Sequence, residues 1–197
     1  MQLAFYRLHN KLGNTYESGS LRKFHLGRTD IIRTCSSDAE AFVKSMPQYD
    51  NTSNIQTKLS NDERAKLLLK AIHSHRLYTN SVINCESFDR HLLGLKLISI
   101  ENNMDLPDLY KDIAYQKACH YHISSSQVSS KYETVTSYGP AVEDGYGACY
   151  NILEKKIMFG ISSNNSCKET NSKIFANYIQ NALIDCQNLL LKVNHKL

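Results

Sequence analysis

The residues best suited to chemistry form one run, Ser124-Ser125-Ser126-Gln127, in the second half of this 197-residue chain. The segment before it, 119–122, alternates small or apolar residues with polar ones, and the segment 132–138 after it is rich in β-branched and aromatic side chains, so both are predicted to be strands. Neighbouring residues of a strand point to opposite faces, so Ser124 and Ser126 are predicted to share one face. Hydroxyls on a rigid strand can act as fixed hydrogen-bond donors in a site. A solvent-exposed strand end explains the same run, because serine is common where strands end.

Histidine, the usual general base, occurs eight times. His120 and His122 are predicted to share one strand face and could form a pair, whereas His73 and His75 lie on different faces of a predicted helix. A catalytic base needs an orienting partner and a cleft, and the sequence has neither a His-Glu-x-x-His nor a Gly-x-Ser-x-Gly motif. The residues alone therefore give no complete catalytic set, and a structural role is favoured for each histidine.

The composition excludes several classes of protein. With 42% hydrophobic and 21% charged residues the chain is globular, one domain or part of a larger one. The net charge of +4 is spread over scattered residues without a basic run, which argues against nucleic acid and leaves an anionic small molecule open. The six cysteines contain no Cys-x-x-Cys pair and no zinc spacing, so free thiols and no metal site are predicted. No apolar run approaches a membrane span, which leaves peripheral membrane contact open.

The elements that must position these residues alternate between helices and strands. A polar segment at 48–58 is predicted to be a surface loop. Two capping boxes, Ser37 with Glu40 and Ser60 with Glu63, each predict a helix start, and Ser166 or Thr170 is expected to cap the last helix. The predicted helices span 2–10, 38–46, 61–82, 88–100, 107–117 and 170–195, and the predicted strands span 31–34, 119–126, 132–138, 148–150 and 156–162. The segment 16–20 is predicted to be a short strand or a loop.

This order of elements predicts an α/β fold with a mixed β-sheet flanked by helices, because strands occur in a hairpin as well as between helices. The segment 88–100 is too rich in leucine for a surface helix, so it is predicted to be largely buried. Arg90 at its start then needs an ionic partner or reaches a cleft. A snorkelling surface arginine is an equal alternative.

Several motifs together resemble the carnitine/choline acyltransferase family, in its order and at close to its spacing. They are Tyr16-Glu17-Ser18, the segment 24–30, the segment 89–95, Ser124 to Val128, Gly139-Pro140, Asp144 to Gly147 and Ser166 to Thr170. The resemblance runs from about residue 2 to 190. It implies that 1–197 is a single partial domain, the carboxyl-terminal half of such an enzyme, similar to a chloramphenicol acetyltransferase-like domain.

The resemblance also implies a function, the transfer of a short acyl group between coenzyme A and carnitine, and it is greatest to the acetyl-transferring carnitine enzymes. Ser126 matches the family's oxyanion donor. Other positions match carnitine-binding residues (Tyr16, Ser18, Thr29, Arg90 and Ser124), coenzyme A contacts (Arg76 and Gln127) and the acyl or carnitine pocket (Thr136, Tyr138 and Ala141). Carnitine is favoured over choline, because choline-specific members lack the arginine and the threonine. Coenzyme A is then a cosubstrate, and no permanently bound cofactor is expected.

The family's catalytic histidine stands in a His-x-x-x-Asp context, and none of the eight histidines here has aspartate four residues on. This chain alone is therefore predicted to be inactive. The alternative is a non-catalytic truncated product that binds carnitine or coenzyme A or serves as an interaction module, and no partner protein is identifiable. The last three residues, His195-Lys196-Leu197, resemble a peroxisomal address, so peroxisome or mitochondrion is the predicted compartment. Thr136 leaves the acyl-chain length open, and the oligomeric state is open as well.

Overall fold

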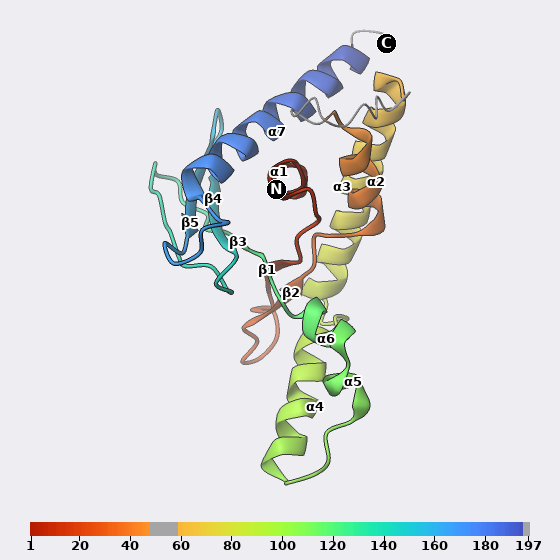
Figure 1. Ribbon diagram of the computed structural model, residues 1–197, viewed down its shortest axis with the longest axis vertical. Coiled ribbons are helices and arrows are strands. Elements are labelled where there is room, and N and C mark those ends of the chain that lie inside the picture. The colour runs from red at the N-terminus through yellow and green to blue at the C-terminus, as the bar shows by residue number, and fades with distance from the viewer. Residues whose placement is uncertain (48–58, 195–197) are drawn as a thin grey trace.

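The computed structural model describes residues 1–47 and 59–194 and contains a five-stranded mixed sheet with helices packed against it (Figure 1). The strands lie in the order β2-β1-β3-β4-β5, with parallel pairing of β3 to both β1 and β4 and antiparallel pairing at both edges. This confirms the predicted α/β class. The strands are β1 (Thr15–Ser20), β2 (Thr29–Ile32), β3 (Ile123–Gln127), β4 (Tyr146–Ile152) and β5 (Ile157–Ser163).

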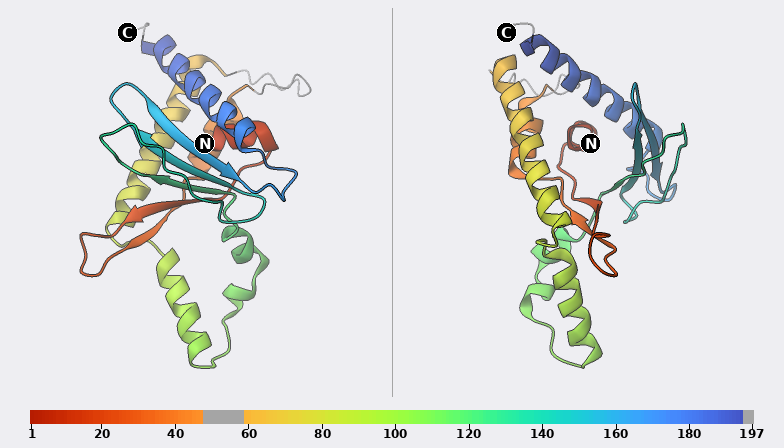
Figure 2. Two further views of the ribbon diagram at one scale, coloured as in Figure 1. Left: turned by 90° about the vertical axis from the view of Figure 1, so that its left-hand side faces the viewer. Right: turned by 180° about the vertical axis from the view of Figure 1, so that it is seen from behind.

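Seven helices are present in the described ranges. α1 lies between the sheet and the pair α2 and α3, α7 runs across the same side, and α4 to α6 project away from the sheet (Figures 1 and 2). None of these helices is long and apolar enough to cross a membrane. The helices are α1 (Gln2–His9), α2 (Ser37–Ser45), α3 (Asn61–Ile83), α4 (Asp89–Glu101), α5 (Asp108–Lys111), α6 (Ile113–Ala118) and α7 (Ser172–Asn194).

An aromatic cluster fixes the sheet against these helices. Phe175 of α7 is fully buried and stacks on Tyr146 of β4, with ring centroids 4.2 Å apart. Phe5 of α1 meets both rings edge-on, at 6.3 Å from Tyr146 and 6.2 Å from Phe175. Stacked and edge-on aromatic pairs of this kind add stability beyond the burial of their area. Three elements distant in sequence are thereby held together next to the start of β4.

Helix starts follow local chemistry, with two corrections. At α3 the predicted capping box is confirmed, since Ser60 accepts from the Glu63 amide at 3.2 Å and the Glu63 carboxylate accepts from the Ser60 amide at 2.7 Å. At α2 the predicted cap was wrong by one residue: Ser36 is extended and accepts from the Ala39 amide. At α7 neither predicted cap is used, because Asn171 accepts from the Ile174 amide.

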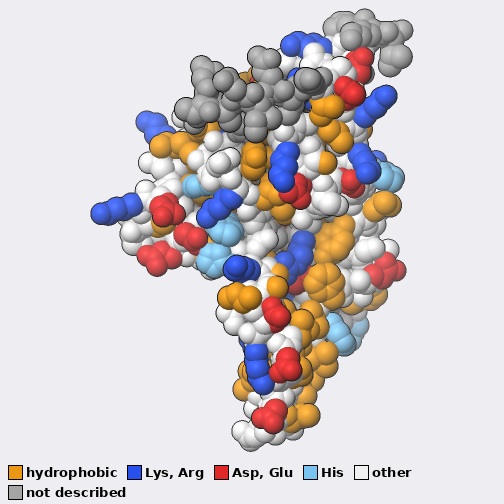
Figure 3. All heavy atoms as spheres, turned by 45° about the vertical axis from the view of Figure 1, so that its right-hand side comes forward, with side chains coloured by type: hydrophobic (Ala, Val, Ile, Leu, Met, Phe, Trp, Pro, Cys, Tyr) orange, Lys and Arg blue, Asp and Glu red, His pale blue; other side chains and the backbone are white. Residues whose placement is uncertain are grey.

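The prediction that 88–100 is largely buried was wrong. α4 forms as predicted, but none of its residues is buried. Hydrophobic side chains gather over the projecting part of the molecule (Figure 3). On α4 the exposed large apolar residues are Leu93, Leu95, Leu97, Ile98 and Ile100. In the described part of the chain, no other element therefore forms a layer over the exposed apolar residues of α4.

Three other predicted elements differ from the structure. The helix predicted over 107–117 is split at Asp112, whose extended backbone ends α5 and whose carboxylate caps α6. The strand predicted over 119–126 begins only at Ile123. The segment 132–138 is not a strand, because it lies across the sheet with its Thr136 carbonyl against Gly160 of β5. The hairpin of β4 and β5 is confirmed. The loop at 48–58 and residues 195–197 lie outside the described residues.

Candidate functional site

One face of the sheet carries the polar residues of β1 and β3. The two strands pair in parallel with Tyr16 opposite Ser124, so the next residues on this face are Ser18 and Ser126. Neighbouring strands lie about 4.8 Å apart, which places the four side chains in one group. Ser124 is nearly buried and Ser126 is half-buried. Ser124 and Ser126 therefore share one face of β3, as the alternation of side chains predicted, and the structure adds that this face continues onto β1.

Arg90, the second residue of α4, reaches this face from the side. Its Nε donates to the Thr29 carbonyl at 3.1 Å, and its guanidinium lies 3.4 Å from the Tyr16 hydroxyl. The Ser18 hydroxyl donates to the same Tyr16 oxygen at 3.4 Å. Tyr16, Ser18, Thr29 and Arg90, here called the arginine cluster, thus form one connected set. A guanidinium flanked by hydroxyls suits the binding of a carboxylate.

A second arginine, Arg33, binds the first residue of α4. Arg33 donates to both carboxylate oxygens of Asp89, at 3.0 and 2.7 Å, and to the Ala118 carbonyl at 2.7 Å. It also contacts the hydroxyl of Tyr121, where burial is the main reason that the pKa is raised to about 12. The carboxylate of Asp89 therefore pairs with Arg33 and not with its neighbour Arg90. Within the described ranges no carboxylate lies at salt-bridge distance from Arg90, so its charge can meet a bound anion.

The opposite face of β1 and β3 is held by a buried carboxylate. Glu17 accepts from the Ser125 hydroxyl at 2.9 Å and from the Tyr150 hydroxyl at 2.6 Å. Burial is the main cause of the raised pKa of Tyr150, and the Glu17 carboxylate adds to it. The sequence reasoning missed Glu17 as a functional support. The available signal was its place between Thr15 and Gly19, where alternation puts it on the inner face of the strand.

Substitution of Ser125 by alanine should destabilise the fold. It removes one of two hydroxyl donors from the Glu17 carboxylate, and a buried polar group left short of partners costs about 1–3 kcal/mol. Urea denaturation of the 197-residue chain measures the difference in unfolding free energy. Ser129→Ala is the matched control, because Ser129 is exposed and its loss should change stability by less than about 0.5 kcal/mol. Equal stability of both variants would contradict the support role of Glu17.

Comparison with known proteins identifies the family of this chain. The family model described as choline/carnitine O-acyltransferase matches residues 1–181, which is most of the chain. The chain belongs to the choline/carnitine O-acyltransferase family. It is 48% identical over 190 residues to carnitine O-acetyltransferase of Rattus norvegicus and to that of Homo sapiens. It is 39% identical over 194 residues to choline O-acetyltransferase of Danio rerio.

The matches cover 96–98% of this chain but only 29% of each of these relatives. The chain therefore spans less than a third of the length of the curated relatives it matches. The matched part includes every residue of the arginine cluster and all of β3. Family membership thus applies to the described site, whereas the activity of the whole relatives extends to this chain only as a proposal.

The three positions that match the family's acyl or carnitine pocket, Thr136, Tyr138 and Ala141, differ in their contacts and exposure. The hydroxyl of Tyr138 donates to the carbonyls of Ser124 and Ala148 at 3.3 and 3.2 Å, and burial raises its pKa, which keeps it a donor. Thr136 lines a cavity of about 10 Å³ over β4 and β5, too small for more than a water-sized group. Ala141 is exposed in the turn that leads to β4.

The two predicted coenzyme A contacts do not meet in the described structure. Arg76 is exposed on α3, and Gln127 is exposed at the end of β3. No hydrogen bond joins them in residues 1–47 and 59–194. A ligand that touched both would have to extend over the surface between α3 and the sheet. Their binding roles therefore stay predictions, as do those of the arginine cluster, Ser124 and Ser126.

Proposed function

We propose that this chain forms part of an enzyme that transfers an acetyl group between coenzyme A and carnitine. The arginine cluster is the observation that carries the proposal. It places one cation and three hydroxyl-bearing residues on the same face of the sheet as Ser126. The relatives at 48% identity carry the matching name, carnitine O-acetyltransferase.

Arg90 supports carnitine over choline as the acceptor. Carnitine has a carboxylate that a guanidinium attracts, whereas choline carries only its trimethylammonium charge, which a guanidinium repels. Choline O-acetyltransferases occur among the relatives at lower identity, 39–40%, so the family name alone leaves both substrates open. The charge at Arg90 is the physical reason to choose between them.

The proposed reaction uses the face of β3. The hydroxyl oxygen of carnitine attacks the thioester carbon, and the carbonyl oxygen becomes an oxyanion in the tetrahedral intermediate. The Ser126 hydroxyl donates to that oxyanion, and the thiolate of coenzyme A leaves as the carbonyl re-forms. A general base must remove the proton of the carnitine hydroxyl, and in this proposal a longer enzyme supplies it. Coenzyme A is a cosubstrate, with Arg76 positioned on the surface to meet an anionic part of it.

Replacement of Arg90 by asparagine should raise the KM for carnitine by roughly 10–100-fold. The estimate follows because a hydrogen bond to a charged group contributes about 1.5–3 kcal/mol. The suitable enzyme is a chimera in which this chain replaces the matched 190-residue segment of Rattus norvegicus carnitine O-acetyltransferase. Steady-state kinetics with acetyl-CoA and carnitine give KM and kcat.

Arg22→Asn in the same chimera is the matched control, because Arg22 is exposed and lies outside the arginine cluster. The control should leave the KM for carnitine within about twofold of the unsubstituted chimera, the scatter expected for a surface change. The Arg90→Asn chimera should use choline as an acceptor better than the unsubstituted chimera does, because the repulsive charge is gone. An unchanged KM for carnitine would refute the assignment of Arg90 and remove the basis for carnitine over choline.

A further inference from the structure

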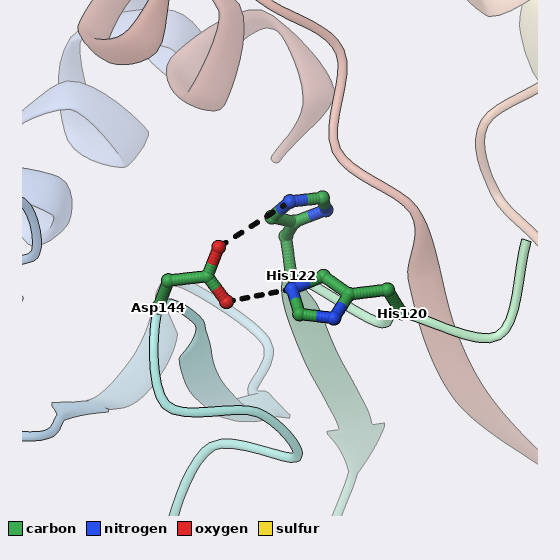
Figure 4. Close-up of side chains that lie close together, drawn as sticks. All are labelled: His120, His122 and Asp144. Atoms are coloured by element: carbon green, nitrogen blue, oxygen red, sulfur yellow. Dashed lines mark hydrogen bonds and ion pairs between the residues drawn. The ribbon is translucent and has the colours of Figure 1, made fainter. Parts of the chain in front are cut away.

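Three side chains converge at the start of β3, and none of them belongs to the arginine cluster. His120 Nε2 lies 2.7 Å from Asp144 Oδ1, and His122 Nε2 lies 3.7 Å from Asp144 Oδ2. Both imidazole rings point toward the one carboxylate (Figure 4). One potential ligand atom from each residue lies within 4.8 Å of the other two. The spacing of cysteines and histidines predicted no metal site, because the third group, Asp144, is distant in sequence.

The backbone holds this cluster in place. β3 and β4 pair in parallel with Ile123 opposite Tyr146, and the Tyr146 amide donates to the His122 carbonyl at 2.7 Å. A Cβ on Gly145 would lie only 2.9 Å from that carbonyl, so glycine allows the close approach of the turn. The pairing thus fixes Asp144 beside the two histidines. The sheet, and not the flexible side chains alone, determines where the three groups meet.

The two ring nitrogens of His122 differ, since Nε2 faces Asp144 and Nδ1 lies on the other side of the ring. Its Nδ1 is buried and has no hydrogen-bond partner in the part of the chain that the structure describes. A metal ion held beside Asp144 would bind the Nε2 atom of His122, with the ring proton on the buried Nδ1 atom.

We propose that His120, His122 and Asp144 form a binding site for a zinc ion. Two imidazoles and one carboxylate are ligands that Zn²⁺ accepts, at bond lengths of about 2.0–2.2 Å. Those lengths and a tetrahedral geometry put ligand atoms roughly 3.3 Å apart, between the two distances to Asp144 in the structure, 2.7 and 3.7 Å. The three ligand atoms lie within 4.8 Å of one another, so rotation of the side chains must bring the set to that spacing. All three residues are partly exposed, so the fourth position is open to water.

Bound zinc would connect the start of β3 to the turn before β4. Without a metal, His120 Nε2 and Asp144 Oδ1 form a hydrogen bond, which contributes little where it is half exposed. The positive charge of Lys11 acts electrostatically on His122, and it also opposes a cation bound there. The affinity should therefore be moderate, and the effect on folding should be a stabilisation that increases with zinc concentration.

The test uses the tag-free 197-residue chain, titrated with zinc sulfate in a calorimeter and with cobalt chloride in a spectrophotometer. We expect one equivalent of metal to bind, the thermal midpoint to rise with zinc, and Co²⁺ to give visible d–d bands. A near-ultraviolet charge-transfer band would instead reveal binding by the free cysteines. Absence of saturable binding, or binding that carries the thiolate band alone, would overturn the proposal.

Two ligand variants, Asp144→Asn and His122→Asn, should each weaken zinc binding by roughly 10–100-fold or more, since loss of an outer partner alone has that effect. Asparagine keeps the size of aspartate, and circular dichroism without metal checks that both variants fold. The matched control removes two histidines that are also two residues apart, His73→Ala with His75→Ala on α3, and should keep the affinity. Unchanged affinity in the ligand variants, or equal loss in the control, would refute the site.

Discussion

The 197-residue chain on its own is expected to transfer no acetyl group between coenzyme A and carnitine. The hydroxyl of carnitine becomes a strong nucleophile only when a base removes its proton, and such a base contributes about 10²–10⁴ to the rate. Family resemblance places that base on a histidine followed four residues later by aspartate. None of the eight histidines in this chain has that neighbour. His120 and His122 are the two nearest to β3, and both face Asp144.

The measurement compares the purified chain with the chimera at equal concentration, by release of free coenzyme A from acetyl-CoA in the presence of carnitine. The chimera should turn over, and the chain alone should not exceed the rate without protein. Clear turnover by the chain alone would contradict the prediction. A folded chimera without turnover would instead contradict the proposed function and favour a non-catalytic chain that only binds carnitine or coenzyme A.

Short-range features of the fold could be predicted from the sequence because their causes are local. The capping box of Ser60 and Glu63 involves four consecutive residues, and it is present in the structure. The hairpin of β4 and β5 needs only two strands and a short turn. The last helix, predicted over 170–195, is present as α7, and Phe175 and Ile179, which are four residues apart on it, are both buried. Each of these signals is contained in a window of a few turns or strands.

Burial of α4 could not be predicted in the same way. A leucine-rich helix requires an apolar cover, but its own composition does not say which segment supplies one. In the described part of the chain no helix or strand covers Leu95 or Ile98, which are about half exposed. The prediction of a strand at 132–138 was wrong for a related reason. Its β-branched residues favour extended backbone, yet a strand needs a free neighbouring edge, and this segment lies across Gly160 instead of beside it.

The site was predictable as a set of positions and not as a set of contacts. Family motifs gave Tyr16 and Arg90, but the contact between them joins residues 74 apart in the sequence. The ion pair of Arg33 with Asp89, which leaves Arg90 directed at the sheet, came only from the structure. Asp144 likewise lies beside His120 and His122 because β3 and β4 pair in parallel. Long-range pairing of this kind is determined by the whole fold, so it has no signature in any local window.

Replacement of Ser126 by alanine in the chimera should lower kcat by roughly 10²–10³. Ser126 lies opposite Cys149 of β4 and one residue beyond Ser125, whose bond to the Glu17 carboxylate holds the strand. A hydroxyl on a strand fixed from both sides needs no rearrangement to meet the oxyanion of the tetrahedral intermediate. Such a donor acts mainly in the transition state, so the KM for carnitine should change far less than kcat.

Steady-state kinetics over a range of carnitine concentrations separate the two constants. Ser129→Ala is the control for loss of a nearby hydroxyl, because Ser129 is exposed beyond the end of β3, and it should keep the kcat of the chimera. Ser126→Thr should recover part of the rate, since it restores a hydroxyl at the cost of one methyl group in a half-buried place. A kcat that survives Ser126→Ala, or a loss confined to KM, would show that the Ser126 hydroxyl binds substrate and does not stabilise the oxyanion.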